Sequence, residues 1–177
     1  MSYIILEKRE SGGRMKKNVE DQQREKGSEN ATVDVRLATV EDIPAITAIE
    51  EASFPNPWKA ESFLSELKDN RIARYYCLVI NDKVVGYMGV WLVAGEAHIT
   101  NVAIWPGFRS KGWGEYLMRY VMQDLKKRGL VSITLEVRVS NIPAQKLYTK
   151  LGFKAAGVRR KYYSDNKEDA FIMWAKL

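Results

Sequence analysis

Three residues in the second half of the sequence have side chains that could move a proton: Glu136, Tyr148 and His98. Glu136 lies on the polar face of an alternating segment, where burial could raise its pKa toward the range useful for taking a proton from an ammonium, directly or through water. A surface ion pair of Glu136 with Arg138 or a lysine is the alternative. The spacing of Tyr148 favours a core aromatic, and His98, the only histidine, is equally compatible with a satisfied strand residue.

The segment Arg109, Ser110, Lys111, Gly112, Trp113, Gly114 has the composition of an anion-binding loop. It precedes a predicted helix, whose first amides and positive end would face an anion, while the two basic side chains add charge. A dinucleotide fingerprint would need glycine at Leu117, and a P-loop counted from Gly107 would need lysine at Trp113. Two interpretations of the segment stay open: it binds phosphate without either motif, or it is a purely structural loop.

Hydrophobic periodicity predicts the elements that must position these groups. Apolar residues alternate, as in strands, from Val33 to Leu37 and over residues 75–80, 84–93, 97–104 and 133–139. Helical spacing predicts helices that end near 52, lie around 63–67, and cover about 113–128 and 144–151. Closing strands near 153–158 and 169–175 complete a mixed α/β order around one sheet.

The composition is that of one globular domain. Of the 177 residues, 46% are hydrophobic and 28% charged, and no run of about 18 apolar residues predicts a membrane span or secretory signal. Residues 7–31 contain few apolar side chains, so residues 1–31 are predicted to be a disordered leader before a domain at 32–177. The cytoplasm is the expected location.

The numbers of cysteine and histidine residues and the net charge exclude some classes of function and leave others open. Cys77 is the only cysteine, so a disulfide within the chain is excluded, and its apolar surroundings predict a buried strand thiol. One cysteine and one histidine make a zinc or iron site unfavourable, and no metal is predicted. The net charge of +6 favours acidic or phosphorylated partners, including nucleic acid, but a solvated basic surface explains it equally well.

Several blocks of the sequence resemble the GNAT superfamily of N-acetyltransferases. The loop at 109–114 matches the superfamily pattern Arg/Gln-x-x-Gly-x-Gly/Ala for the pyrophosphate of acetyl-CoA. The blocks SFPNPW, NVAIWPGFRSKGWGEYLM, LEVRVSNIPAQKLYTKLGF and RRKYYSDNKEDAFIMWAKL resemble the bacterial ribosomal-protein-alanine N-acetyltransferases and their archaeal N-terminal acetyltransferase relatives, over residues 33–177. The resemblance implies an α/β fold with one central, mostly antiparallel sheet, a splayed parallel strand pair and about four flanking helices.

The resemblance also implies how acetyl-CoA is bound and how the acetyl group is transferred. The amine would attack the thioester directly in a ternary complex, with Glu136 as base, His98 as an auxiliary base and Tyr148 donating a proton to the coenzyme A thiolate. A phenol with a pKa near 10 can donate that proton and still be un-ionised at neutral pH. The implied acetyl-CoA contacts are the backbone of Val102, Ala103 and Ile104, the amides of Arg109, Ser110, Lys111, Gly112, Trp113 and Gly114, and Asn141.

The implied acceptor is a protein N-terminus, for which small-subunit ribosomal proteins that begin with alanine are the expectation. Phe54, Pro55 and Trp58 would form one wall of its site, opposite Tyr162 and Tyr163 in the final hairpin. From the residues alone, a core turn explains the first group equally well. The alternatives are a lysine, polyamine or antibiotic amine as acceptor, or a basic RNA- or ribosome-binding module that holds acyl-CoA without turnover. The presence of both Glu136 and Tyr148 argues against the module, and stable nucleic-acid binding is not expected.

Overall fold

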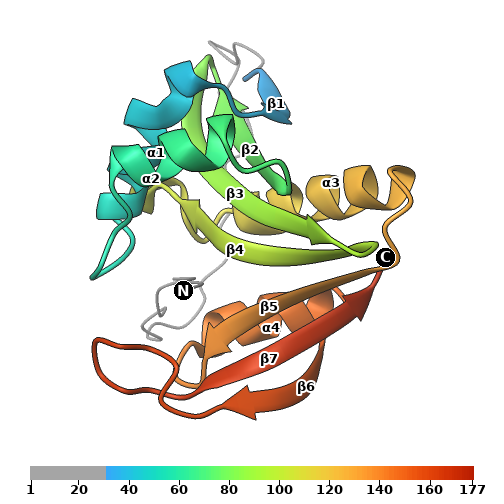
Figure 1. Cartoon of the computed structure of the whole chain (residues 1–177). Helices are drawn as coiled ribbons and strands as arrows, with labels where there is room; N and C mark the ends of the chain where they lie inside the picture. Colours follow the sequence, from blue (N-terminus) through green and yellow to red (C-terminus); the bar gives the residue numbers. More distant parts are fainter. Residues whose placement is uncertain (1–30) are drawn as a thin grey trace, which may run out of the picture.

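A computed structural model of the protein describes residues 31–177, which form a seven-stranded sheet with four α-helices around it (Figure 1). The predicted leader lies outside the described residues except for Ala31. No helix in this described part is long and apolar enough to cross a membrane. In chain order the elements are β1 (Val33–Leu37), η1 (Val40–Asp42), α1 (Ile43–Glu51), α2 (Ala60–Lys68), β2 (Ala73–Ile80), β3 (Lys83–Val93), β4 (Glu96–Ile104), η2 (Pro106–Phe108), α3 (Trp113–Lys127), β5 (Ser132–Arg138), α4 (Ile142–Lys150), β6 (Lys154–Arg159) and β7 (Ala170–Lys176).

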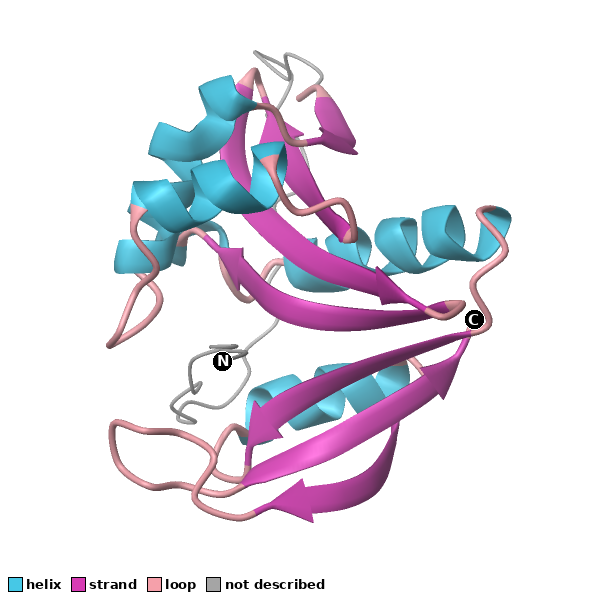
Figure 2. Ribbon diagram, in the orientation of Figure 1, coloured by secondary structure: helices cyan, strands magenta, loops and turns pink. Residues whose placement is uncertain are grey.

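The strands lie in the order β1-β2-β3-β4-β5-β7-β6, and every neighbouring pair is antiparallel except β4 and β5. The β4/β5 ladder holds only three residue pairs, from Glu96 with Ser132 to His98 with Thr134. Beyond them β4 stays paired with β3 as far as Ile104, and β5 stays paired with β7. The parallel pair therefore separates after His98 (Figure 2), which confirms the predicted splay.

The β2–β3 hairpin illustrates how local sequence sets the register of the sheet. Asn81 and Asp82 have φ angles of 49° and 60°, as a two-residue type I′ turn requires. Asparagine and aspartate tolerate this left-handed region better than most residues do. The turn pairs Ile80 with Lys83 and thereby fixes which face each side chain of β2 occupies.

Each face of the sheet has its own apolar core. In β2, Tyr75 and Cys77 belong to the core shared with α1 and α2, whereas Tyr76 and Leu78 belong to the core shared with α3 and α4. This division follows from the two-residue period of a strand. Cys77 is fully buried, and desolvation raises the pKa of its thiol to about 12, which confirms the predicted buried strand thiol.

Candidate functional site

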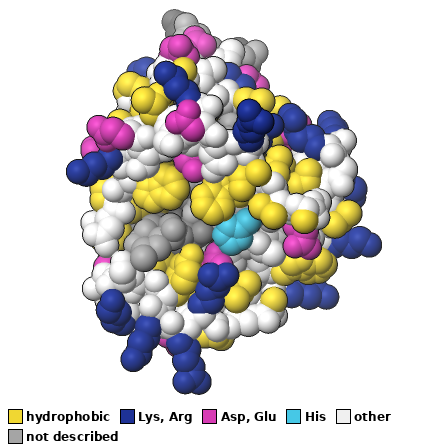
Figure 3. All heavy atoms as spheres, in the orientation of Figure 1, with side chains coloured by type: hydrophobic (Ala, Val, Ile, Leu, Met, Phe, Trp, Pro, Cys, Tyr) yellow, Lys and Arg dark blue, Asp and Glu magenta, His cyan; other side chains and the backbone are white. Residues whose placement is uncertain are grey.

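Glu136 and His98 meet at the point where β4 and β5 separate. His98 is paired with Thr134, and Glu136 lies two residues beyond Thr134, on the same face of β5. His98 Nε2 is 3.2 Å from Glu136 Oε2, and His98 Nδ1 is 2.9 Å from Thr134 Oγ1. The Glu136 side chain is 1% exposed and the His98 side chain 33%, so the imidazole connects a buried carboxylate with the surface. Figure 3 shows this histidine in cyan, with hydrophobic side chains beside it.

The pKa of Glu136 is lowered, contrary to the expected rise. Burial raises the pKa of this carboxyl, but the close contact with the His98 imidazole and the charge of Arg159 together lower it more. Arg159 Nε, from the end of β6, lies 3.3 Å from Glu136 Oε1. The expectation failed because it considered desolvation without the two neighbours. Glu136 is therefore an ionised carboxylate at neutral pH.

Tyr148 lies in the core and also carries an unsatisfied hydroxyl. Its ring packs 5.7 Å from that of Phe153, as the apolar stripe of α4 predicts. Among the described residues, the buried Tyr148 hydroxyl has no hydrogen-bond partner. Burial raises its pKa well above the ordinary value, so the phenol is protonated at neutral pH and can donate a hydrogen bond to a ligand.

Asn141 lies between β5 and α4, immediately before the first residue of α4, the helix that carries Tyr148. Its Oδ1 accepts a hydrogen bond from Ala144 N at 3.2 Å, which caps the helix. Its side-chain oxygen thus has a structural partner in addition to any contact with acetyl-CoA.

The segment between β4 and α3 ends in Gly112, the residue at which the helix α3 is capped. Gly112 immediately precedes α3 with φ +86°, a left-handed conformation that favours glycine. The first amides of α3, those of Trp113, Gly114 and Glu115, have no intrahelical acceptor, and the positive end of the helix adds to their attraction for an anion. A Cβ on Gly114 would make only ordinary contacts, the nearest 3.7 Å from Leu147 Cδ2, so packing among the described residues does not require glycine there.

The basic side chains of this segment bind the protein itself. Arg109 Nε donates to Ile104 O at 2.9 Å, and its Nη2 donates to Ser53 Oγ at 2.8 Å. Lys111 Nζ donates to Gly107 O at 2.9 Å. Arg109 thus ties the loop to the end of β4 and to the segment after α1. The backbone amides, more than these two charges, are the groups that the structure leaves for an anion.

The two predicted aromatic walls meet in one apolar cluster. Phe54 and Tyr163 are buried in this cluster, and Trp58 and Tyr162 are partly buried against it. Pro55 is exposed. Phe54 and Tyr163 are therefore buried more deeply than two walls facing an acceptor require, and the contact of all five residues with the acceptor stays a prediction. Phe54 and Tyr163 form the support for Pro55, Trp58 and Tyr162.

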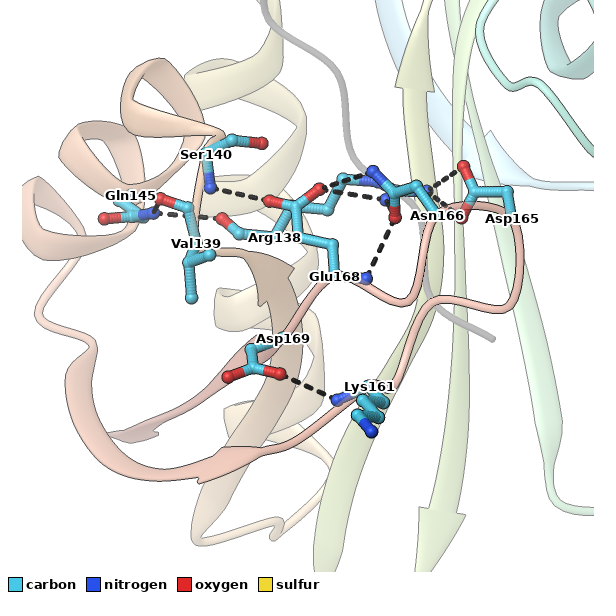
Figure 4. Close-up of polar contacts among 9 residues, drawn as sticks. All are labelled: Arg138, Val139, Ser140, Gln145, Lys161, Asp165, Asn166, Glu168 and Asp169. Atoms are coloured by element: carbon cyan, nitrogen blue, oxygen red, sulfur yellow. Dashed lines mark hydrogen bonds and ion pairs between the residues drawn. The ribbon is translucent and has the colours of Figure 1, made fainter.

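Arg138, which the sequence suggested as a partner of Glu136, instead holds the segment between β6 and β7 (Figure 4). Its Nη2 donates to both oxygens of Asp165, at 3.0 and 2.9 Å, and its Nη1 donates to Glu168 Oε2 at 3.0 Å. Although desolvation opposes ionisation, hydrogen bonds from Ser140 and Arg138 lower the pKa of Glu168 to about 2. These contacts fix the final hairpin, with Tyr162, beside the end of β5.

Strands that separate beside a helix N-terminus suit a long phosphorylated thioester, whose arm can bond to strand backbone while helix amides hold its phosphates. The fold and this site define an acyl-CoA-dependent transferase. Residues 43–153 match the Acetyltransferase (GNAT) family, and the chain belongs to that family. It is accordingly an acetyltransferase, and its relatives are N-acetyltransferases.

Three similar proteins place the chain within the family. A Bacillus subtilis protein provisionally named as a ribosomal protein bS18-alanine N-acetyltransferase is 43% identical over 143 residues, or 81% of this chain and 95% of that protein. The crystal structure of the ribosomal-protein-S18-alanine N-acetyltransferase from Escherichia coli matches 82% of this chain and 94% of its own, with a TM-score of 0.76 and 33% identity. The PaiA N-acetyltransferase from Thermoplasma acidophilum, solved with coenzyme A, shares the fold at a TM-score of 0.70 and 19% identity, over 82% and 99% of the two chains.

GNAT acetyltransferases use acetyl-CoA, and three features of this chain fit that molecule. Val102 to Ile104 lie on β4 beyond its last pair with β5, so their backbone edge faces the splay. The turn from Ser110 to Gly114 opens α3, and the Tyr148 hydroxyl is buried without a partner among the described residues. Residues 31–177 contain no group of three or more His, Cys, Asp or Glu side chains that could hold a metal ion.

Proposed function

We propose that this acetyltransferase transfers the acetyl group of acetyl-CoA to the N-terminal α-amine of a ribosomal protein that begins with alanine, by direct attack in a ternary complex. The names of the Bacillus subtilis and Escherichia coli relatives support the acceptor. The observation that carries the proposal is the pair of Glu136 and His98 where β4 and β5 separate.

The donor is held by backbone on two elements. Bound acetyl-CoA supplies a thioester that a free amine can attack. The edge of Val102 to Ile104 binds its arm, and the amides of Ser110 to Gly114 bind its pyrophosphate, with Asn141 bordering the arm. The Arg109 amide, which the sequence also suggested, donates instead to Pro106 O at 3.2 Å. This binding orients the acetyl group between the separated strands, and orientation alone removes a large part of the barrier to a bimolecular reaction.

Proton transfer divides between an exposed imidazole and a buried carboxylate. Because its pKa is lowered, Glu136 is a weak base, but its negative charge attracts the acceptor ammonium and its carboxylate orients the imidazole of His98. His98 accepts the proton and, being partly exposed, passes it to water. Tyr148 donates its hydroxyl proton to the leaving sulfur, and its phenolate then takes up the second proton that the attacking nitrogen loses.

An N-terminal amine suits this site better than a lysine does. An α-amine has an ordinary pKa of about 8, against about 10.4 for lysine, so its reactive free base costs less to form at neutral pH. We call residues 54–58 the acceptor loop. Its exposed members, together with Tyr162 of the final hairpin, border the path of an extended chain that enters end-on.

The test is intact-mass analysis of two peptides incubated with the enzyme and acetyl-CoA. One peptide has a free N-terminal alanine and no lysine, and the other is blocked at its N-terminus and carries a lysine. We expect one acetyl group on the first peptide and none on the second. Acetylation of the blocked peptide alone would reject the proposal and assign the enzyme to lysine acceptors.

A further inference from the structure

Glu50 is a buried carboxyl that the acetyl-transfer chemistry does not use. It lies in the last turn of α1 and is 1% exposed. One oxygen, Oε1, accepts a hydrogen bond from Trp58 N at 3.2 Å, and the other, Oε2, accepts one from the Tyr87 hydroxyl of β3. Within residues 31–177, no cation forms an ion pair with it. Glu50 therefore joins the acceptor loop to the sheet.

The network continues to the strand that borders the splay. Asn101 Nδ2 donates to the Tyr87 hydroxyl at 3.0 Å, and Thr100 Oγ1 donates to Asn101 Oδ1 at 2.8 Å. A Cβ on Gly89 would lie 2.6 Å from both Asn101 Oδ1 and Thr100 Oγ1, so β3 leaves space for these groups only because it has glycine there. Asn101, within this chain of hydrogen bonds, directly precedes Val102, where the proposed donor site begins.

A carboxyl in this position is costly, which makes a purely space-filling role a poor explanation. Desolvation raises the pKa of Glu50 to about 7, although the hydrogen bonds from Tyr87 and Trp58 oppose that rise. An apolar side chain would fill the same volume without this cost, but it could accept neither hydrogen bond. The carboxyl accepts both hydrogen bonds at once and so links the Trp58 amide to Tyr87 of β3.

The acceptor loop is anchored at its start by the Phe54 amide, which donates to Glu50 O at 3.0 Å, but few backbone donors follow Phe54. Pro55 and Pro57 have no N–H, so Asn56 and Trp58 supply the only backbone donors from residue 55 to residue 58. The Trp58 amide bonds to Glu50. On the other side, Ser53 accepts a hydrogen bond from Arg109 of the segment 109–114, which we call the donor loop, so the chain is held just before the acceptor loop begins.

We propose that Glu50 is a positioning residue for the acceptor: it holds the acceptor loop at a fixed place relative to β4, so that the amine meets the acetyl group bound along that strand. This inference rests on the proposed function, because the role of the acceptor loop is assigned there. Glu50 acts through Trp58 and does not touch either substrate.

The experiment compares three variants with the wild-type enzyme. Glu50→Ala removes both hydrogen bonds, Glu50→Gln keeps a side-chain oxygen for Trp58 N, and Glu51→Ala removes the exposed neighbouring carboxylate as a matched control. We expect Glu50→Ala to raise the KM for the alanine peptide by about tenfold, roughly the value of a buried hydrogen bond, with kcat and acetyl-CoA affinity nearly unchanged. Glu50→Gln should restore most of the KM, and Glu51→Ala should match the wild type.

Amide hydrogen exchange over residues 54–59, measured without substrates, tests the same inference independently of activity. Exchange should accelerate in Glu50→Ala and stay slow in the other two variants. If Glu50→Ala does not fold, Tyr87→Phe can replace it. This variant removes one of the two hydrogen bonds to Glu50 and should also raise the KM for the alanine peptide, by a smaller factor.

Unchanged exchange and KM in folded Glu50→Ala would overturn the inference. So would an equal loss of acetyl-CoA and peptide affinity, because that pattern indicates general loosening. If exchange responds as expected but the wild type acetylates no N-terminal peptide, the loop attachment is supported and the proposed function fails.

Discussion

A buried hydroxyl without a partner costs free energy, and Tyr148 carries one in the core beneath α4. The ring alone would satisfy the packing, because its contact with Phe153 is apolar. The hydroxyl is thus the part of the side chain that the described protein leaves unexplained. A role as proton donor to the coenzyme A sulfur explains it.

Tyr148→Phe separates the core role from the chemical role. Because the hydroxyl has no partner among the described residues, its removal should leave the free energy of unfolding unchanged or slightly raised. Turnover should fall by roughly 10² to 10⁴, the usual range for a general acid, while acetyl-CoA affinity stays nearly constant. Thermal unfolding, calorimetry and steady-state kinetics on one preparation check all three. Wild-type turnover would leave Tyr148 as a core residue only.

At the scale of elements, the start of α3 is the part most directly shaped for an anion. Gly112 precedes the helix with φ +86°, so every substitution there is strained, and a loss of acetyl-CoA binding would not distinguish strain from blocking. Gly114 has no such constraint, since a Cβ there meets only ordinary contacts within the protein. Gly114 is therefore the better position at which to test the approach of the pyrophosphate.

Gly114→Val should weaken acetyl-CoA binding by at least about tenfold, because a branched side chain would stand where the phosphates approach the helix amides. Gly114→Ala is the matched control. The superfamily pattern allows alanine at this position, so its affinity should stay close to that of the wild type. Calorimetric titration measures both, and circular dichroism verifies the fold. Equal affinity in all three proteins would show that Gly114 does not face the ligand.

At the scale of the whole molecule, the residues proposed for the donor and those proposed for the acceptor belong to cores on opposite faces of the sheet. Tyr148 and the helix that follows the donor loop contribute to the core shared by α3 and α4, whereas Phe54 and the acceptor loop belong to the core shared by α1 and α2. The sheet would keep the two substrates apart everywhere except where β4 and β5 separate. We therefore propose that the two substrates meet where β4 and β5 separate.

Much of this arrangement could be predicted from the sequence, because periodicity reports which face a residue occupies. The alternation around Glu136 and the helical spacing around Tyr148 placed both residues on the right elements. Partners distant in sequence could not be predicted. Arg138 binds Asp165, 27 residues away, and Glu50 accepts from Tyr87, 37 residues away. The predicted direction of the Glu136 pKa shift was wrong for the same reason, because the shift depends on neighbours from other strands.

The most direct test of the account is the turnover of Glu136→Gln with the alanine peptide, measured from pH 5 to 9. We predict a fall in kcat of roughly 10² to 10⁴ with acetyl-CoA affinity nearly intact. Because the pKa of Glu136 lies below its ordinary value, the carboxylate is ionised throughout this range, and the loss should be similar on the acid and neutral sides of the profile. Wild-type turnover in the folded variant would contradict a role for the Glu136–His98 pair in proton transfer.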